Sequence, residues 1–94
     1  MFIQMSTLKP KPEFDWEVVE SMKRFRNALG GAPGLIGAHT MRDAGSGTLF
    51  GLVFWASESA MLASAHLAQA AVASDPFDEW LSEPIANFRL EEVT

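Results

Sequence analysis

The 94-residue sequence contains no cysteine. This absence excludes disulfide bonds, a thiolate nucleophile and any metal site built on cysteine ligands. The chain also lacks an apolar run long enough to span a bilayer. Its first eight residues have no basic start, no long apolar run and no small-residue cleavage site, so we predict no signal peptide. Together these absences predict a protein of the reducing cytoplasm that makes no membrane contact.

Basic residues are scarce in the chain. Seven Lys and Arg stand against twelve Asp and Glu, which gives a formal net charge of −5. This balance excludes nucleic acids and anionic membranes as partners, because so few scattered cations cannot form a basic face. Hydrophobic residues make up 48% and charged residues 20% of the chain, which is typical of a folded protein. At this length we expect a single domain over residues 1–94.

Residues 49–56, with the sequence LFGLVFWA, form the stretch around which we expect the chain to fold. Alternate residues of a strand point to opposite faces, and neither set here is polar. The two sets are Leu49, Gly51, Val53 and Trp55, and Phe50, Leu52 and Phe54. A strand that is apolar on both faces must be covered on both. Because so short a chain has helices for one face only, we expect a homodimer in which a second copy covers the other face.

Three further segments are predicted to be strands. Residues 2–8 and 35–42 have the composition of strands, and residues 86–93 alternate as a last strand at the sheet edge does. Residues 9–12 contain two prolines and end the first strand, because proline cannot donate to a sheet ladder. Residues 43–47 (DAGSG) predict a hairpin turn, so the second and third strands are expected to pair antiparallel.

A first helix is expected over about residues 16–29, with Asp15 as its N-cap. Three basic side chains, Lys23, Arg24 and Arg26, lie late in this helix and complement its dipole. We interpret this charged run as a solvated helix end.

A second helix is expected over about residues 58–73, with Ser57 as its cap. Asp75 as N-cap and Pro76 at the first helical position predict a short helix through about Leu81. The complete order is strand, helix, strand, strand, helix, short helix, strand. This βαββαβ order predicts a ferredoxin-like α+β fold, in which a four-stranded antiparallel sheet carries both longer helices on one face.

Two segments, PGLIGAHTMRD (residues 33–43) and GTLFGLVFWASESAMLASAH (residues 47–66), resemble the antibiotic-biosynthesis-monooxygenase-like group of dimeric α+β barrel proteins. That group has a Pro-Gly pair entering the second strand, a Trp closing the third, a Ser/Glu-rich helix start and often a His in the second helix. The matching positions are Pro33, Gly34, Trp55, Ser57, Glu58 and His66.

The resemblance implies a homodimer whose two sheets face each other to form a barrel. It also implies a pocket in each subunit between the sheet and the helices. In active members this pocket takes an aromatic or polyketide-like substrate, and some members oxidise it with molecular oxygen and no metal, flavin or other cofactor. The protein's task is then to orient the substrate, stabilise its anion and exclude water.

Heme-degrading relatives provide a sharper comparison, and this sequence lacks their residues. They use an Asn on the first strand, a Trp within the second helix and a heme-ligating His further along. The corresponding positions here are near Ile3 or Gln4, then Ser64 and Ser74, and His66 lies too early to be the ligand. We therefore predict that the protein does not degrade heme.

The two histidines are the candidate acid–base groups. His66 falls at the margin of the apolar side of its predicted helix, so it could reach a pocket and deprotonate a phenol, or remain a boundary residue bonded to water or backbone. His39 shares strand parity with Leu35, Gly37 and Met41, which could point it into a dimer barrel or the pocket, or leave it structural. Two histidines without clustered carboxylates do not make a metal site.

Aromatic side chains are the candidates for a pocket wall. Trp55, Trp80, Phe25 and Phe77 could stack on an aromatic ligand or pack in the core. Asn87, on the last strand, could hold a substrate oxygen or face water.

Two functional hypotheses follow from the sequence and the resemblance. The first is a cofactor-independent monooxygenase that acts on a hydrophobic aromatic or quinol-type molecule, with His66 as candidate base. The second is a non-catalytic, ligand-binding or stress-associated dimer of the same fold, because a fold does not determine a function. A third alternative, an isomerase or lyase for a small carbonyl compound, would need only one base and an oxyanion donor.

Overall fold

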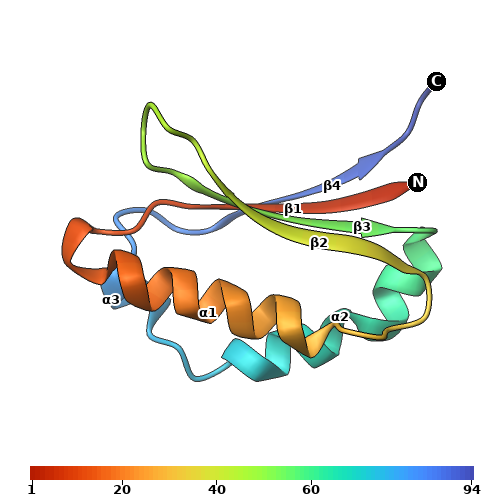
Figure 1. Cartoon of the computed structure of the whole chain (residues 1–94), viewed down its shortest axis with the longest axis horizontal. Coiled ribbons are helices and arrows are strands. Elements are labelled where there is room, and N and C mark those ends of the chain that lie inside the picture. Colours follow the sequence, from red (N-terminus) through yellow and green to blue (C-terminus); the bar gives the residue numbers. More distant parts are fainter.

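A four-stranded antiparallel sheet covered by helices on one face makes up the structure, a computed structural model that describes all residues from Met1 to Thr94 (Figure 1). The strand order is β2-β3-β1-β4, which confirms the predicted ferredoxin-like fold. In chain order the elements are β1 (Phe2–Leu8), α1 (Asp15–Ala28), β2 (Leu35–Arg42), β3 (Leu49–Trp55), α2 (Glu58–Val72), α3 (Phe77–Trp80) and β4 (Ala86–Glu91).

The central strand β3 has the two-faced character that its sequence predicts. Leu49, Val53 and Trp55 are buried against the helices, with exposed fractions of 2%, 5% and 0%. Val53 and Trp55 belong to a hydrophobic cluster with Leu29 and Met61. Leu49 belongs to a second cluster, which contains residues of α1 and packs against α3. The alternate residues of β3 point away from the helices, so the sheet has an inner and an outer face.

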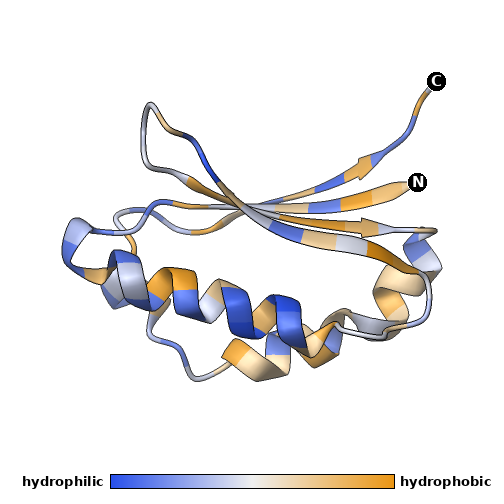
Figure 2. Ribbon diagram, viewed as in Figure 1, coloured by the Kyte–Doolittle hydropathy of each residue, from blue (hydrophilic) through white to orange (hydrophobic).

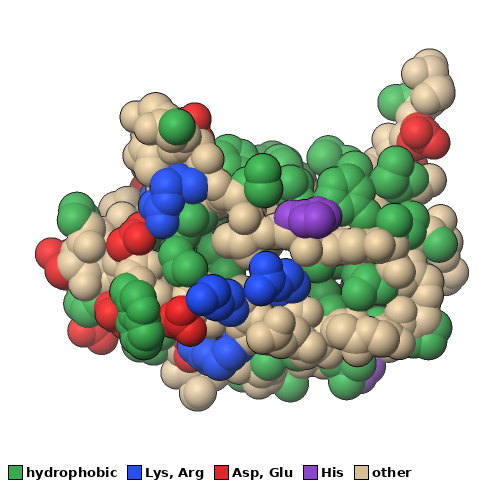
Figure 3. All heavy atoms as spheres, in the orientation of Figure 1, with side chains coloured by type: hydrophobic (Ala, Val, Ile, Leu, Met, Phe, Trp, Pro, Cys, Tyr) green, Lys and Arg blue, Asp and Glu red, His purple; other side chains and the backbone are tan.

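The outer face of the sheet carries rows of apolar side chains. Strand register places Met5 of β1 opposite Leu52 on one side and Phe88 on the other. Neighbouring outer-face positions Ile36, Met41, Phe88 and Leu90 have exposed fractions of 62%, 55%, 44% and 42%. Hydrophobic side chains project from the sheet on the side away from the helices (Figure 3). One face of the sheet is thus apolar and uncovered by this chain.

Two aspartates predicted as helix caps have other partners. Helix α1 begins at Asp15 itself, after a 3₁₀ turn over Pro12–Phe14, and the Asp15 carboxylate accepts two hydrogen bonds of 2.9 Å from Arg42 of β2. Asp75 is bound by side chains of α1. Charged partners compete with backbone N–H groups for a carboxylate and form the stronger hydrogen bonds, which explains both corrections.

The other helix boundaries are close to their predictions. The Ser57 side chain caps α2 by accepting a hydrogen bond of 3.2 Å from the backbone N–H of Ala60.

Helix α2 is coloured mostly pale to orange in Figure 2, whereas α1 alternates between blue and orange. None of the helices combines the length and the apolar character needed to cross a membrane.

Candidate functional site

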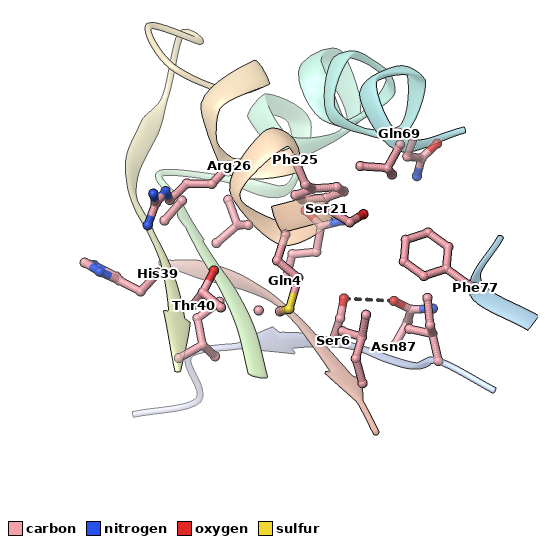
Figure 4. A pocket seen from close by; sticks show the side chains of 18 residues that line it. Gln4, Ser6, Ser21, Phe25, Arg26, His39, Thr40, Gln69, Phe77 and Asn87 are labelled. Atoms are coloured by element: carbon pink, nitrogen blue, oxygen red, sulfur yellow. Dashed lines mark hydrogen bonds between the residues drawn. The ribbon is translucent and has the colours of Figure 1, made fainter. Parts of the chain in front are cut away.

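A cavity of about 250 Å³ lies between the inner face of the sheet and the helices (Figure 4). Small-molecule pockets typically measure about 300–1,000 Å³, so this cavity suits a ligand of roughly one or two aromatic rings. It lies where the family resemblance implies a pocket. Its lining residues come from all four strands, α1, the end of α2 and α3.

Apolar and aromatic side chains form most of the cavity wall. Met22 and Phe25 come from α1, and Phe77 comes from α3. Met22 packs directly over Gly51 of the central strand, where a Cβ would be in van der Waals contact with its Cε at 3.4 Å.

Ser21 is the most deeply buried polar residue of the wall, with an exposed fraction of 1%. Its hydroxyl donates a hydrogen bond of 2.6 Å to Oδ2 of Asp75, in the loop after α2. Arg24 holds the same carboxylate, with 3.0 Å between its Nη2 and Oδ2. The Asp75 side chain is only 11% exposed, and the two partners compensate its charge.

Ser6 and Asn87 form a second polar group on the sheet side of the cavity. They face each other across β1 and β4, and the Ser6 hydroxyl donates a hydrogen bond of 3.0 Å to Oδ1 of Asn87 (Figure 4). Inward parity on β1 places Ser6 here, between the buried side chains of Phe2 and Leu8.

Gln4 lines the cavity and has an unsatisfied amide. Its Oε1 is buried and has no hydrogen-bond partner, as is true of Nε1 of Trp55 on the neighbouring strand. An orphaned buried polar atom costs about 1–3 kcal/mol. No protein hydrogen bond fixes the orientation of this amide, so rotation about its last bond can present either its donor or its acceptor to a ligand.

Arg26 brings a positive charge to the cavity. It lies on one side of the cavity, and Phe77 and Asn87 lie on the other (Figure 4). Arg26 takes part in none of the ion pairs of the structure, whereas Arg24 and Arg42 each hold an aspartate. In the space-filling view, basic side chains lie at the opening between α1 and the sheet (Figure 3). The interpretation of this charged run as a solvated helix end is wrong for Arg26, because the helix turns it toward the sheet.

Four of the residues predicted to form a site are among those that line this cavity. They are Phe25, His39, Phe77 and Asn87. His39 contributes to the rim, but its imidazole points away from the cavity (Figure 4). The ring packs edge-on against Phe54 on the outer face, with ring centroids 5.9 Å apart.

The structure does not bring the other three predicted residues to the cavity. Trp55 is 0% exposed and fills the core beside Phe2 and Leu29. Trp80 packs edge-on against Phe77, with ring centroids 5.9 Å apart, and so supports the wall from behind. His66 is exposed on α2 and is not among the lining residues. This position gives no support to its predicted role as a base.

Sequence reasoning missed most polar residues of the cavity. These are Gln4, Ser6, Ser21, Arg26, Thr40 and Gln69. A usable signal existed for one of them, because Ser21 follows Val18 by three residues and precedes Phe25 by four, within the apolar stripe of α1. A hydroxyl in such a stripe is buried with the stripe and needs a partner.

Two side chains with a shifted pKa lie at the β2–β3 hairpin, outside the cavity. The hydrogen bond to Asp15 raises the pKa of Arg42. Hydrogen bonds from the Ser46 hydroxyl and the Gly45 backbone lower the pKa of Asp43. Asp43 therefore favours the folded hairpin above its ordinary pKa, and this contribution is lost as the pH falls through the lowered value.

Solved structures of several bacterial proteins resemble this fold. Rv0793 from Mycobacterium tuberculosis superposes with a TM-score of 0.84 at 15% sequence identity, covering 99% of this chain and 95% of that one. A putative antibiotic biosynthesis monooxygenase from Nitrosomonas europaea gives a TM-score of 0.76 at 12% identity, with full coverage of both chains. The heme-degrader MhuD from Mycobacterium tuberculosis gives 0.74 at 20% identity, covering 100% and 97%. At these identities the similarity establishes the fold alone.

A search of curated proteins found no sequence similar to this chain. The sequence profile of one family, antibiotic biosynthesis monooxygenase, matches residues 1–76. That match covers β1 to α2 and most of the elements that line the cavity. The chain therefore belongs to the antibiotic biosynthesis monooxygenase family.

Proposed function

We propose that this protein binds a small hydroxylated aromatic molecule in the cavity and oxidises it with molecular oxygen, without a prosthetic group. The observation that carries the proposal is the unpaired guanidinium of Arg26 on a cavity walled by Phe25 and Phe77. Aromatic walls suit a planar apolar ring, and a cation at low dielectric suits an oxygen that becomes an anion. The family membership supports the same assignment.

Arg26 is assigned to the phenolate oxygen of the bound ligand. A nearby positive charge favours the ionised form, so the pKa of a bound phenol falls. The electron-rich anion can then pass an electron to oxygen. For a quinol the balanced reaction converts one ring C–H bond into C–OH and the two hydroxyls into carbonyls. The second oxygen atom leaves as water with the two hydrogens released.

The proton of the phenol is released to solvent in this account. No carboxylate is among the residues that line the cavity, and both imidazoles lie away from its interior. The rate is therefore expected to rise with pH as the bound phenol ionises, rather than to follow the titration of a histidine.

Substitution of Arg26 by glutamine tests this function. We expect kcat/KM for oxygen uptake with a panel of naphthols, quinols and anthrones to fall about 10²-fold, since a single preorganised oxyanion donor contributes about 10²–10³-fold. Arg89→Gln is the matched control, because Arg89 is exposed on β4 and does not line the cavity. His66→Ala is expected to keep oxygen uptake within about twofold of the original protein. An equal loss in Arg26→Gln and Arg89→Gln would count against the assignment.

A non-catalytic ligand-binding protein is the second candidate. The same lack of a carboxylate or an inward imidazole at the cavity favours it, because binding an aromatic ring needs no base. The two candidates separate in one experiment. Aromatic ligands that bind to the protein without oxygen uptake above background identify a binder, and uptake that depends on Arg26 identifies the enzyme.

The residues of the cavity do not fit heme, the group named for the similar structure of MhuD. Neither histidine is placed to serve as an axial ligand there, because His39 packs on Phe54 while His66 is exposed on α2. His, Asp and Glu side chains form no cluster of three that could hold a metal ion. We assign heme no part in the reaction.

We also propose that two copies of the chain associate through the outer face of the sheet. The supporting observation is the apolar row of Leu52, Met5 and Phe88 across adjacent strands, with no element of this chain above it. Apolar patches of this kind mark interaction surfaces. Contact between identical faces about a two-fold axis covers both at once, which makes a homodimer the simplest partner.

A further inference from the structure

The hydroxyl of Ser21 has a fixed polarity. A serine hydroxyl carries one hydrogen and two lone pairs. Ser21 donates its hydrogen to Oδ2 of Asp75 over 2.6 Å, a short charge-assisted contact. The residue is 1% exposed and lines the cavity, so the lone pairs of its oxygen are what a ligand meets there.

Asp75 is the residue that sets this polarity. Its carboxylate has no hydrogen to offer, so Ser21 cannot reverse the hydrogen bond. Arg24 holds the carboxylate in place through contacts of 3.2 Å to Oδ1 and 3.0 Å to Oδ2. Asp75 is not among the lining residues of the cavity, so it acts through Ser21 as a positioning residue.

Ser6 repeats the arrangement on the sheet side of the cavity. Its hydrogen is donated to Oδ1 of Asn87 over 3.0 Å, so it also keeps lone pairs for a ligand. Arg26, by contrast, carries donors only and lies on the other side of the cavity from Asn87 (Figure 4). The hydroxyl oxygens of Ser6 and Ser21 thus lie on one side of the cavity, the acceptor side, and the cation of Arg26 lies on the other (Figure 4).

We infer that the cavity selects aromatic ligands with two oxygens at opposite ends of the ring system, one an oxyanion at Arg26 and the other a hydroxyl that donates to Ser21. This inference rests on the proposed function and deepens it by naming Ser21, held by Asp75, as the residue that determines which second substituent of the ring is accepted. An ether or carbonyl oxygen of a ligand at this position would place its lone pairs against those of the Ser21 oxygen. No hydrogen bond could form between them, and two buried acceptors would be left unsatisfied.

The same polarity separates substrate from product. Oxidation of a quinol to a quinone removes the hydroxyl hydrogen that Ser21 accepts. The product therefore meets the acceptor side with a carbonyl and binds less well than the substrate. Asp75, which makes no contact with the ligand, contributes in this way to the release of product.

Calorimetric titration of the full chain with two stable compounds tests the inference. The compounds are 2,6-dihydroxynaphthalene and 6-methoxy-2-naphthol, which differ by one methyl group on the second oxygen, so that only the first compound can donate a hydrogen bond from that oxygen. In the original protein we expect the dihydroxy compound to bind at least about tenfold more tightly, as one satisfied buried hydrogen bond implies.

Two variants give different expected results. In Asp75→Ala the Ser21 hydroxyl is free to donate, so the methoxy compound should bind more tightly and the ratio should fall to within about threefold. In Ser21→Ala the ratio should fall because the dihydroxy compound binds more weakly. Asp15→Ala, which removes the carboxylate of an arginine pair outside the cavity, should keep the original ratio.

The inference is overturned if the two compounds bind the original protein equally, or if folded Asp75→Ala keeps the original ratio. A gain in affinity for the methoxy compound separates positioning from a merely structural role, since loss of structure weakens binding. If Asp75→Ala does not fold, the ratio in Ser21→Ala decides the matter. Failure of both compounds to bind the original protein would overturn the proposed function as well, whereas equal binding overturns the selectivity alone.

Discussion

Replacement of Met5 by glutamate is expected to leave the protein folded but monomeric in solution. Met5 lies at the centre of the outer face, between Leu52 and Phe88 in the register of the sheet. In the proposed dimer the new carboxylate would be buried without a partner, once in each copy. Burial of an unpaired charge costs several kcal/mol, so the dissociation constant should rise by at least about 10³-fold.

Sedimentation equilibrium at micromolar concentration measures this effect. Leu62→Glu is the matched control, because Leu62 is a 57% exposed apolar residue on α2, on the helical side of the molecule. We expect the original protein and Leu62→Glu to be dimers and Met5→Glu to be a monomer. An original protein that stays monomeric, or a Met5→Glu variant that stays dimeric, would contradict the proposed interface.

The substitution Gly34→Ala is expected to reduce the free energy of unfolding by about 2–5 kcal/mol. Gly34 has φ of +81°, a conformation that side chains disfavour, at the entry to β2. A Cβ at this position would also lie 2.5 Å from Cβ of Ala60 in the first turn of α2. Two penalties therefore add, one from the backbone and one from the contact.

A substitution at Gly31 distinguishes the backbone penalty from the contact penalty. This glycine has φ of +80°, yet nothing lies within 4 Å of a Cβ built there, so Gly31→Ala should cost only the backbone penalty of about 1–2 kcal/mol. Urea unfolding of both variants measures the difference. The double variant Gly34→Ala with Ala60→Gly should recover part of the loss, because it removes the facing methyl group. Equal losses at the two glycines would mean that β2 and α2 do not approach closely at this point.

The fold was predictable because its signals are local. The continuous apolar run of β3 and the turn residues at 43–47 lie within a few positions of one another, and the elements follow from them. The partners of Asp15 and Asp75 were not predictable in this way. Asp15 pairs with a residue 27 positions away and Asp75 with one 54 positions away, so their roles depend on the assembled fold.

The cavity was only partly predictable for a related reason. Large aromatic residues are candidates for a pocket wall in a sequence, but Trp55 is 0% exposed and belongs to the core, where such side chains contribute most to stability. The polar lining comes from small side chains whose strand parity or helical face turns them inward. Ser6 and Ser21 are examples, and nothing in the local sequence distinguishes them from surface serines except their apolar neighbours.

One sheet serves two purposes in this account. Its inner face, with Gly51 at the centre, provides the floor of the cavity, and its outer face provides the proposed contact between copies. Successive residues of β3 alternate between these faces. A strand whose two faces are both covered, one by the helices and one by a second copy, is apolar on both, as β3 is.

The most direct test of the account is a nuclear magnetic resonance titration of the labelled protein with 2-naphthol. We expect the chemical shift changes to be concentrated at the cavity, at residues such as Ser6, Ser21, Phe25 and Gly51. Outer-face residues such as Met5 and Phe88 should change little. Changes that cluster on the outer face instead, or no changes at saturating ligand, would contradict the claim that this cavity is the functional site.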